Sequence, residues 1–378
     1  MEYFFILGNH PELSKSEIQS VLEKQKISYS QTASEATFLI LEIEHDLNGI
    51  EFINQLGGTI KLGKVIEQIG QPTPQALVKE IEIDDKKINF GISVYNNNLD
   101  PNKLGIQIKR LLKEDGHKVR FVTGKEQPLS SVIVKKNILN KQGTELVLLK
   151  HKNHFYLGQT LAVQPFELYS QLDYGRPARD DRSGMIPPKL AQIMINLSQI
   201  GKDEALLDPF CGSGTVLQQA LLSDYQKVTG TDASKKAISD SKENLDWLAD
   251  QIEQTVTATI KQENVVTLDR VIKPESIQAV VTEPYLGPPL RGGESPEKMQ
   301  SIVEDLTNLY AKTFNSLKKV LVKNGTIVII IPMFQMLKNQ YPIHLGNILP
   351  KGLVLENQWQ YSRPGQQVIR NIYKIVKK

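Results

Sequence analysis

The chain has 378 residues, of which 40% are hydrophobic and 23% charged, with a formal net charge of +3. This is an ordinary soluble globular composition, long enough for two or three domains. The longest apolar stretch, Thr326–Ile331, is too short to span a bilayer, and the opening MEYFFILG lacks the basic start of a signal peptide. A single cysteine, Cys211, excludes an internal disulfide and a multi-cysteine zinc site. We expect a cytoplasmic monomer without membrane or metal partners.

Residues 1–54 are typical of a small α/β subdomain. Tyr3–Leu7 is a short apolar run that predicts a strand, and Ala36–Ile43 predicts a second one. Between them, the apolar spacing over Glu17–Leu22 predicts a helix that packs onto a core.

Residues 55–164 predict a second α/β region. The expected elements are a strand at 89–94, a helix at 104–112, a strand at 119–122, a helix at 129–139 and strands at 145–149 and 155–160. Residues 101–160 hold 12 Lys or Arg against 4 Asp or Glu, a local charge of +8 in a chain that is otherwise negative. Such a basic segment is typical of a surface that binds the phosphate backbone of a nucleic acid. A solvated lysine-rich face that binds nothing is an equally weighted alternative.

The segment 165–188 is rich in Pro, Gly, Asp and Arg and is expected to be a linker. From residue 189 to 378 strands and helices alternate regularly. We expect strands at 205–207, 228–230, 257–261, 277–281, 326–331, 353–360 and 367–375, with helices at 190–197, from 215, at 235–248 and at 302–317. This predicts a doubly wound, mostly parallel sheet with an antiparallel closing strand, whose ligand lies at the carboxyl ends of the strands.

The motif DPFCGSGT (residues 208–215) lies between an expected strand and a helix. Its glycines let backbone amides approach a ligand closely. The missing third glycine argues against a dinucleotide, and no Gly-Lys-Ser/Thr follows for a phosphate cradle. A nucleoside ligand without phosphates remains, such as S-adenosylmethionine (SAM). Asp232 follows 18 residues after Gly214, where an acid reaches ribose hydroxyls, or where it caps the helix that begins near Ser234.

Several segments of the sequence, this motif among them, resemble those of a known protein family. DPFCGSGTVLQQALL resembles the SAM loop of amino-group methyltransferases that act on nucleic acids. The chain as a whole resembles the THUMP-containing tRNA guanosine N2-methyltransferases that act at position 10. YGRPARDDRSGMIPPKLAQIMINL is similar to the stretch before their SAM loop, and FILGNHPELSKSEI to their start. INFGISVY, LGIQIKRLLKEDGHKVRFV and PLSSVIVKKN resemble their THUMP module, which holds the tRNA acceptor end.

This resemblance implies a carboxyl-terminal Rossmann-like SAM methyltransferase and an amino-terminal α/β, ferredoxin-like THUMP region that binds tRNA. The residues expected at SAM are Asp208, Pro209, Phe210, Gly212, Gly214, Thr215, Asp232, Ala233, Asn264 and Val265. The upstream stretch adds Asp181, Arg182 and Pro188 as residues near the cofactor. The residues expected at RNA are Arg120, Lys125, Lys135, Lys136 and Asn137.

The reactive loop is expected at TEPYLGPPL, residues 282–290. An exocyclic guanine amine is a poor nucleophile, so its N–H groups need acceptors that aim its lone pair at the methyl group. Glu283 and the Pro284 carbonyl are the expected acceptors, and Tyr285 is the expected stacking residue. The usual motif has Asp or Asn, then Pro-Pro and an aromatic. Glu283 is one methylene longer than Asp, and its carboxylate must therefore pull back.

Two alternatives stay open. One is a DNA methyltransferase acting on adenine N6 or cytosine N4, although residues 232–283 hold no target-recognition insertion. The other is a non-catalytic RNA-binding protein with a degenerate site. Carbon methylation through Cys211 is disfavoured, because that residue lies inside the cofactor loop. A small activating protein is compatible with the sequence.

Overall fold

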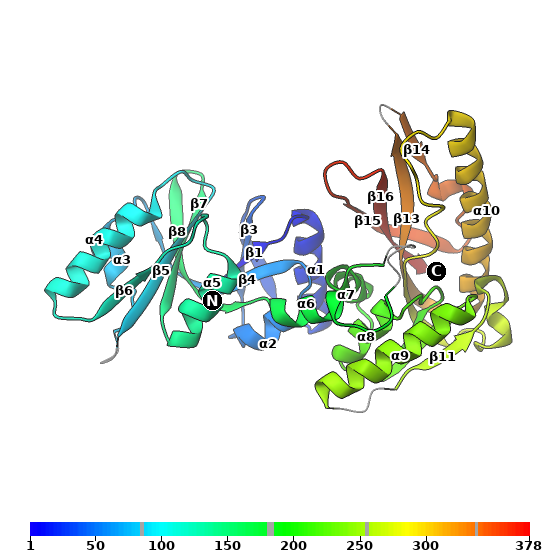
Figure 1. The fold of residues 1–378 in the computed structure, drawn as a ribbon, viewed down its shortest axis with the longest axis horizontal. Helices are drawn as coiled ribbons and strands as arrows, with labels where there is room; N and C mark the ends of the chain where they lie inside the picture. Colours follow the sequence, from blue (N-terminus) through cyan, green and yellow to red (C-terminus); the bar gives the residue numbers. More distant parts are fainter. Residues whose placement is uncertain (84–86, 180–184, 254–256, 337–338) are drawn as a thin grey trace. The chain divides into compact units, whose positions relative to one another are not determined.

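The computed structural model describes residues 1–83, 87–179, 185–253, 257–336 and 339–378. The chain divides into two compact units (Figure 1). Unit 1 comprises residues 1–18 and 25–168, and unit 2 comprises residues 19–24 and 169–378. The expected residues Asp181 and Arg182 lie outside the described residues.

Unit 1 is built on one eight-stranded sheet in the order β2-β3-β1-β4-β8-β7-β5-β6. Its strands are β1 (Glu2–Leu7), β2 (Tyr29–Ser34), β3 (Phe38–Ile43), β4 (Thr59–Ile69), β5 (Ile88–Tyr95), β6 (Val119–Val122), β7 (Thr144–His151) and β8 (His154–Val163). Its helices are α1 (Pro11–Lys24), α2 (Gly49–Asn54), α3 (Pro74–Val78), α4 (Pro101–Glu114), α5 (Ser131–Asn137) and α6 (Phe166–Tyr174), with the 3-10 turn η1 (Leu139–Lys141). The division between the two units falls within α1 and again within α6.

The strand β4 joins the two regions expected for residues 1–54 and 55–164. It pairs antiparallel with β1 on one side and with β8 on the other. Strands from both regions therefore share one sheet.

Two strands of this sheet, β2 and β4, were not predicted from the sequence. β2 is an edge strand whose middle residues are exposed and polar, so it lacks an apolar run. In β4, Lys61, Lys64, Glu67 and Gln68 interrupt the apolar pattern. The helix α6 also lies within the expected linker 165–188.

Unit 2 contains the sheet that the sequence predicted, in the order β11-β10-β9-β12-β13-β16-β15. Its strands are β9 (Ala205–Asp208), β10 (Lys227–Asp232), β11 (Thr259–Gln262), β12 (Ile277–Thr282), β13 (Leu321–Met336), β14 (Asn339–Pro342), β15 (Leu353–Tyr361) and β16 (Val368–Lys377). The first five pair in parallel, and β16 closes the sheet antiparallel to β13. The Rossmann-like α/β class is therefore confirmed, including the antiparallel closing strand.

Helices cover both faces of this sheet. They are α7 (Pro188–Ser198), α8 (Thr215–Leu222), α9 (Lys235–Ile252) and α10 (Pro296–Val320), with the 3-10 turns η2 (Val265–Arg270) and η3 (Leu345–Asn347). Figure 1 shows α10 running beside β13 and β14. The side chains of Ile327, Ile329 and Ile331 share a core with α10. Val328 and Ile330 point to the other face, are fully buried, and lie in a strand that contacts α7.

Parallel strands place all of their carboxyl ends at one edge. Asp208, Asp232 and Thr282 are the last residues of β9, β10 and β12. Because these strands are neighbours in the sheet, the three expected loops meet at this edge.

Candidate active site

The glycine loop after β9 has the conformation that close ligand approach requires. Gly212 and Gly214 have φ angles of +52° and +88°, in the left-handed region that favours glycine. Gly214 is the N-cap of α8, and no side chain caps this helix. The N–H groups of its first turn therefore remain available at the site.

Asp232 binds the glycine loop to the end of β10. Its Oδ2 accepts from the Gly212 N–H at 3.1 Å, and its Oδ1 accepts from the Ser234 N–H at 2.8 Å. The helix α9 is capped by Ser234 itself, whose side chain accepts from the Ala237 N–H. Asp232 thus lies at the glycine loop, and each of its carboxylate oxygens retains a lone pair.

Asp208 is a buried carboxyl group at the start of the glycine loop, and it bonds to Thr282, the residue before the reactive-site Glu283. Its Oδ1 accepts from the Thr282 hydroxyl at 2.6 Å and from the Phe210 N–H at 3.1 Å. Burial raises its pKa to about 7, and the nearby carboxylates of Asp232 and Glu283 act in the same direction. Among the described residues, the charged groups that shift its pKa are all acidic.

Two polar residues of α9, which the sequence analysis missed, hold the loop in place. The Ser241 hydroxyl donates to the Gly212 carbonyl at 2.7 Å, and Asn244 Nδ2 donates to the Ser213 carbonyl at 2.8 Å. Both side chains are fully buried. In the sequence, the sign of this role was that Ser241 and Asn244 are polar residues three positions apart on the buried face of a helix.

Arg176 is a third residue that the sequence analysis missed. It is 2% exposed, and its Nη1 donates to the hydroxyl of Thr215, the first residue of α8, at 2.6 Å. Its Nε and Nη2 are buried and have no hydrogen-bond partner within the described parts of the chain. Burial lowers the pKa of this guanidinium. A buried cation with two unused donors at a helix amino end is suited to an anionic ligand group.

The remaining expected cofactor residues differ in their exposure and contacts. Pro209 is buried, and Phe210 is half-buried against the core beside α10. The exposed Ala233 accepts from Gln262 Nε2 at 3.1 Å. Asn264 caps η2 by accepting from the Val266 N–H at 2.9 Å, so its side-chain oxygen is already engaged.

Val265 is buried in the core. Pro188 is the first residue of α7 and is also buried.

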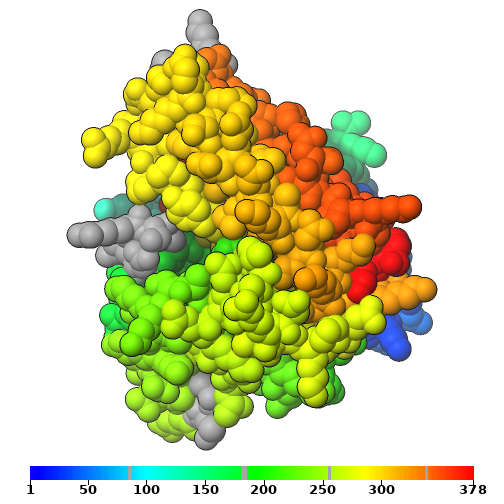
Figure 2. Space-filling view, turned by 90° about the vertical axis from the view of Figure 1, so that its right-hand side faces the viewer, coloured from blue at the N-terminus to red at the C-terminus, as the bar shows by residue number. Residues whose placement is uncertain are grey.

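The reactive loop leaves the sheet at the end of β12. The Glu283 Oε1 accepts from Arg370 Nε at 2.5 Å, and the side chains are 10% and 15% exposed. Pro284 is buried, whereas Tyr285 is 55% exposed. The buried Tyr310 of α10 donates its hydroxyl to the Tyr285 carbonyl at 2.7 Å. In Figure 2, the yellow residues that follow β12 lie at the surface of unit 2.

Cys211 is buried in the glycine loop. Burial raises the pKa of its thiol far above the physiological range, so the thiolate is not accessible as a nucleophile. Within the described ranges, no three His, Cys, Asp or Glu side chains are grouped to hold a metal ion.

The basic residues of unit 1 fall on several elements. Lys135 of α5 pairs with Glu167 at 2.7 Å, a contact that lowers the pKa of that carboxyl. Lys136 is exposed, as are Arg120 of β6 and Lys125 after it, while Asn137 is half-buried.

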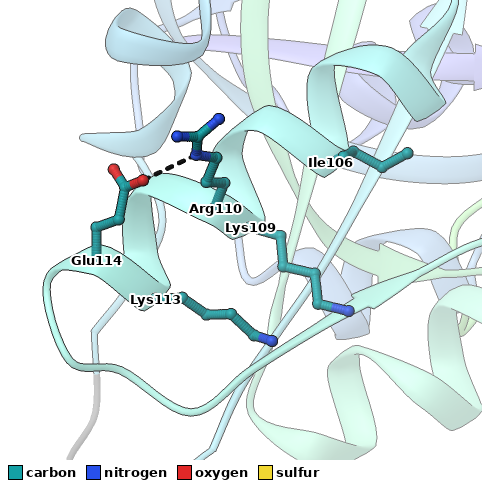
Figure 3. Close-up of a pocket in the computed structure, with 5 residues that line it drawn as sticks. All are labelled: Ile106, Lys109, Arg110, Lys113 and Glu114. Carbon is teal, nitrogen blue, oxygen red and sulfur yellow. Dashed lines mark hydrogen bonds and ion pairs between the residues drawn. The ribbon is translucent and has the colours of Figure 1, made fainter.

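The helix α4 carries further basic residues that the site prediction did not include. Figure 3 shows a hollow on its surface, where Arg110 faces Glu114 at 2.8 Å. Lys109 and Lys113 line the same hollow together with Ile106, which is 64% exposed. The positive charge of unit 1 is therefore not confined to the expected residues.

None of the described helices is both long enough and apolar enough to cross a membrane.

Comparisons with known proteins find a match within unit 2. Residues 176–342 match the model of a methyltransferase domain, UPF0020, RMKL-like. This match begins at Arg176, within the expected linker.

Two relatives are each described as tRNA (guanine(10)-N2)-dimethyltransferase. The protein of Methanothermobacter thermautotrophicus is 25% identical over 342 residues, which is 88% of this chain and 90% of the relative. That of Methanocaldococcus jannaschii is 27% identical over 208 residues, 54% of this chain and 55% of the relative. The resemblance expected from the sequence is thus confirmed.

Solved structures share the fold over the whole chain. TrmN from Thermus thermophilus has a TM-score of 0.60 at 14% identity and is covered completely, as is this chain. SMU.472, a putative methyltransferase complexed with SAH, has a TM-score of 0.53 at 12% identity, and the match covers 100% of this chain and 98% of SMU.472.

Proposed function

Because unit 2 is a methyltransferase domain, we propose that this protein transfers methyl groups from SAM to the exocyclic N2 amine of a tRNA guanosine, at position 10. The observation that carries the proposal is the relative described as a guanine(10)-N2 dimethyltransferase, whose similarity extends over 88% of this chain. The similarity therefore includes unit 1 and not only the methyltransferase domain, which DNA-modifying enzymes also possess.

The carboxyl-terminal edge of the sheet fits SAM by charge. SAM carries a sulfonium and an ammonium group, both positive, and a carboxylate. The site offers the buried Asp208, which has only acidic charged neighbours, and the buried Arg176, which has two unused donors. We assign the cofactor to these two residues, the glycine loop 208–215, and Asp232, Ala233, Asn264 and Val265. When bound, SAM supplies an electrophilic methyl group.

The residues of the reactive loop orient the guanine amine. The Glu283 carboxylate and the Pro284 carbonyl accept its two N–H groups, so that the nitrogen lone pair faces the methyl carbon. Tyr285 is exposed and stacks on the base. Bound SAM would give its methyl group to the amine nitrogen and would leave as the neutral thioether SAH. The amine proton leaves to Glu283 or to water.

Unit 1 contributes the RNA-binding surface in this proposal. We assign a THUMP-like role to residues 55–164, with residues 1–54 as an adjoining subdomain. The residues proposed at RNA are Arg120, Lys125, Lys135, Lys136 and Asn137. Lys135 must exchange its partner Glu167 for a phosphate, so its net gain is smaller than that of the exposed Lys136.

The test uses labelled SAM and an unmodified tRNA transcript. We expect label on the N2 of guanosine 10, and none on a matched transcript with inosine at that position, because inosine lacks the N2 amine. Glu283→Ala should abolish transfer while SAH still binds. Label on adenine or cytosine would support DNA-type amino chemistry instead. SAM binding without transfer to any tRNA would support a non-catalytic RNA-binding protein.

A further inference from the structure

Arg370 reaches the reactive loop from a distant part of the chain. It lies on β16 opposite Pro332 of β13, while Thr282, the residue before Glu283, is paired with Ile329 of β13. The guanidinium therefore extends past β13 to meet the carboxylate at 2.5 Å. Neither the methyltransferase model, which ends at residue 342, nor the reactive motif includes Arg370.

The contact uses one oxygen of the carboxylate and leaves the other. Arg370 Nε donates to Glu283 Oε1, and Oε2 has no hydrogen-bond partner among the residues that the structure describes. Both side chains are largely shielded from water, so the charge-assisted bond is strong and fixes the rotamer. One oxygen is thus anchored, and the other has no bond within the described residues that would keep it from accepting.

The contact with Arg370 restrains a side chain that is one methylene longer than the aspartate of the usual motif. A glutamate after β12 has one more rotatable bond than the usual aspartate, and an unrestrained carboxylate would occupy several positions. Tyr310 holds the loop backbone through the Tyr285 carbonyl, but it does not touch the Glu283 side chain. Within the described residues, Arg370 is the group that holds that side chain.

We propose that Arg370 is a positioning residue, which draws the Glu283 carboxylate back so that its free oxygen accepts an N–H of the substrate amine. The inference rests on the proposed function and extends it to the closing strand of the sheet. It assigns to β16 a part in aligning the nucleophile, an effect for which small displacements matter greatly.

The test is a double-mutant cycle of Arg370→Gln and Glu283→Asp, read as single-turnover methyl transfer to tRNA. Arg370→Gln should slow transfer roughly 30- to 100-fold when Glu283 is present, with the Kd values for SAH and tRNA unchanged. Aspartate is too short to reach Arg370, so Arg370→Gln added to the Glu283→Asp variant should cost less than about threefold. Arg363→Gln removes an exposed arginine of the same hairpin and should leave the rate unchanged.

Three results would overturn the inference: equal fold-losses in wild type and in the Glu283→Asp variant, a rate for Arg370→Gln within about threefold of wild type, or a loss that lies in Kd alone. If Arg370→Gln does not fold, Arg370→Lys keeps the cation and should show a smaller loss that again depends on Glu283. A wild-type protein that methylates no tRNA contradicts the proposed function. Active wild type with additive losses contradicts only the role of Arg370.

Discussion

The two units bury charged groups in opposite ways. In unit 1, Lys61 and Glu145 are 1% and 0% exposed and form an ion pair at 2.5 Å. The hydroxyls of Ser93 and Thr160 also donate to the Glu145 carboxylate, at 2.6 and 2.5 Å. The network crosses β4, β8, β7 and β5, the strands that join the two halves of the sheet. Every charge in it has a partner from the protein.

In unit 2, a buried acid and a buried base form no ion pair among the described residues, although Asp173 is near enough to raise the pKa of Arg176. Asp208 receives two hydrogen bonds but is near other acids, and Arg176 uses one of its nitrogens on Thr215 while Nε and Nη2 lack partners among the described residues. Both lie beside the glycine loop. A buried charge without a protein partner is expensive, and sites that keep such charges are usually sites that bind something. The contrast separates a structural network from a binding site.

The largest expected effect comes from breaking the matched pair. Glu145→Gln leaves Lys61 buried without a counterion, so the free energy of unfolding of unit 1 should fall by ~3–5 kcal/mol. Native-state hydrogen exchange of the amides in β4, β7 and β8 measures this unit separately. The double variant Lys61→Met with Glu145→Met should recover most of the loss. If Glu145→Gln costs less than about 1 kcal/mol, the pair does not hold the sheet together.

Much of unit 2 could be predicted from the sequence, because its signals are local. Apolar runs such as Ile277–Val281 predict buried strands, and the glycine loop predicts the turn that follows β9. The spacing of Asp232 from Gly214 predicts a ribose acceptor, and the structure brings its carboxylate to the Gly212 N–H. Short-range patterns are therefore enough to predict which loops meet at the carboxyl edge of the sheet.

The missed residues depend on contacts between distant positions. Arg370 and Glu283 are 87 residues apart, and Arg176 and Thr215 are 39 apart. No periodicity or motif links such pairs in a single sequence. The site prediction therefore contained the groups that a motif specifies and lacked those that tertiary packing supplies.

The second-largest expected effect is the loss of folding stability that occurs when the buried Asp208 loses its proton. The pKa of Asp208 is about 7 in the folded chain, against 3.8 as its ordinary value. Between these values the folded state holds a proton that the unfolded state has lost, so stability falls as pH rises from about 4 to 7. Asp208→Asn keeps both hydrogen bonds and removes this dependence.

Relative to wild type, Asp208→Asn should gain ~3 kcal/mol in stability between pH 5 and pH 8. Both tryptophans, Trp247 and Trp359, lie in unit 2, so fluorescence-detected denaturation at the two pH values reports on it. The same variant should bind SAM more weakly at pH 8, because it cannot become negative. An equal stability difference at both pH values would show that Asp208 does not titrate in this range.

The smallest expected effect concerns the unmatched base, and it separates a ligand contact from a structural one. If Arg176 meets the carboxylate of SAM, Arg176→Met should weaken SAM about tenfold. Decarboxylated SAM keeps the adenosine, the sulfonium and the amine, so its affinity should change less than about twofold. Isothermal titration of both ligands against wild type, Arg176→Met and the exposed control Arg363→Met provides the comparison. Equal losses for the two ligands would instead mean that Arg176 serves to hold α8 through Thr215. In that case its two unused nitrogens would be a cost of the fold, and only Asp208 would distinguish the binding edge of unit 2 from the paired network of unit 1.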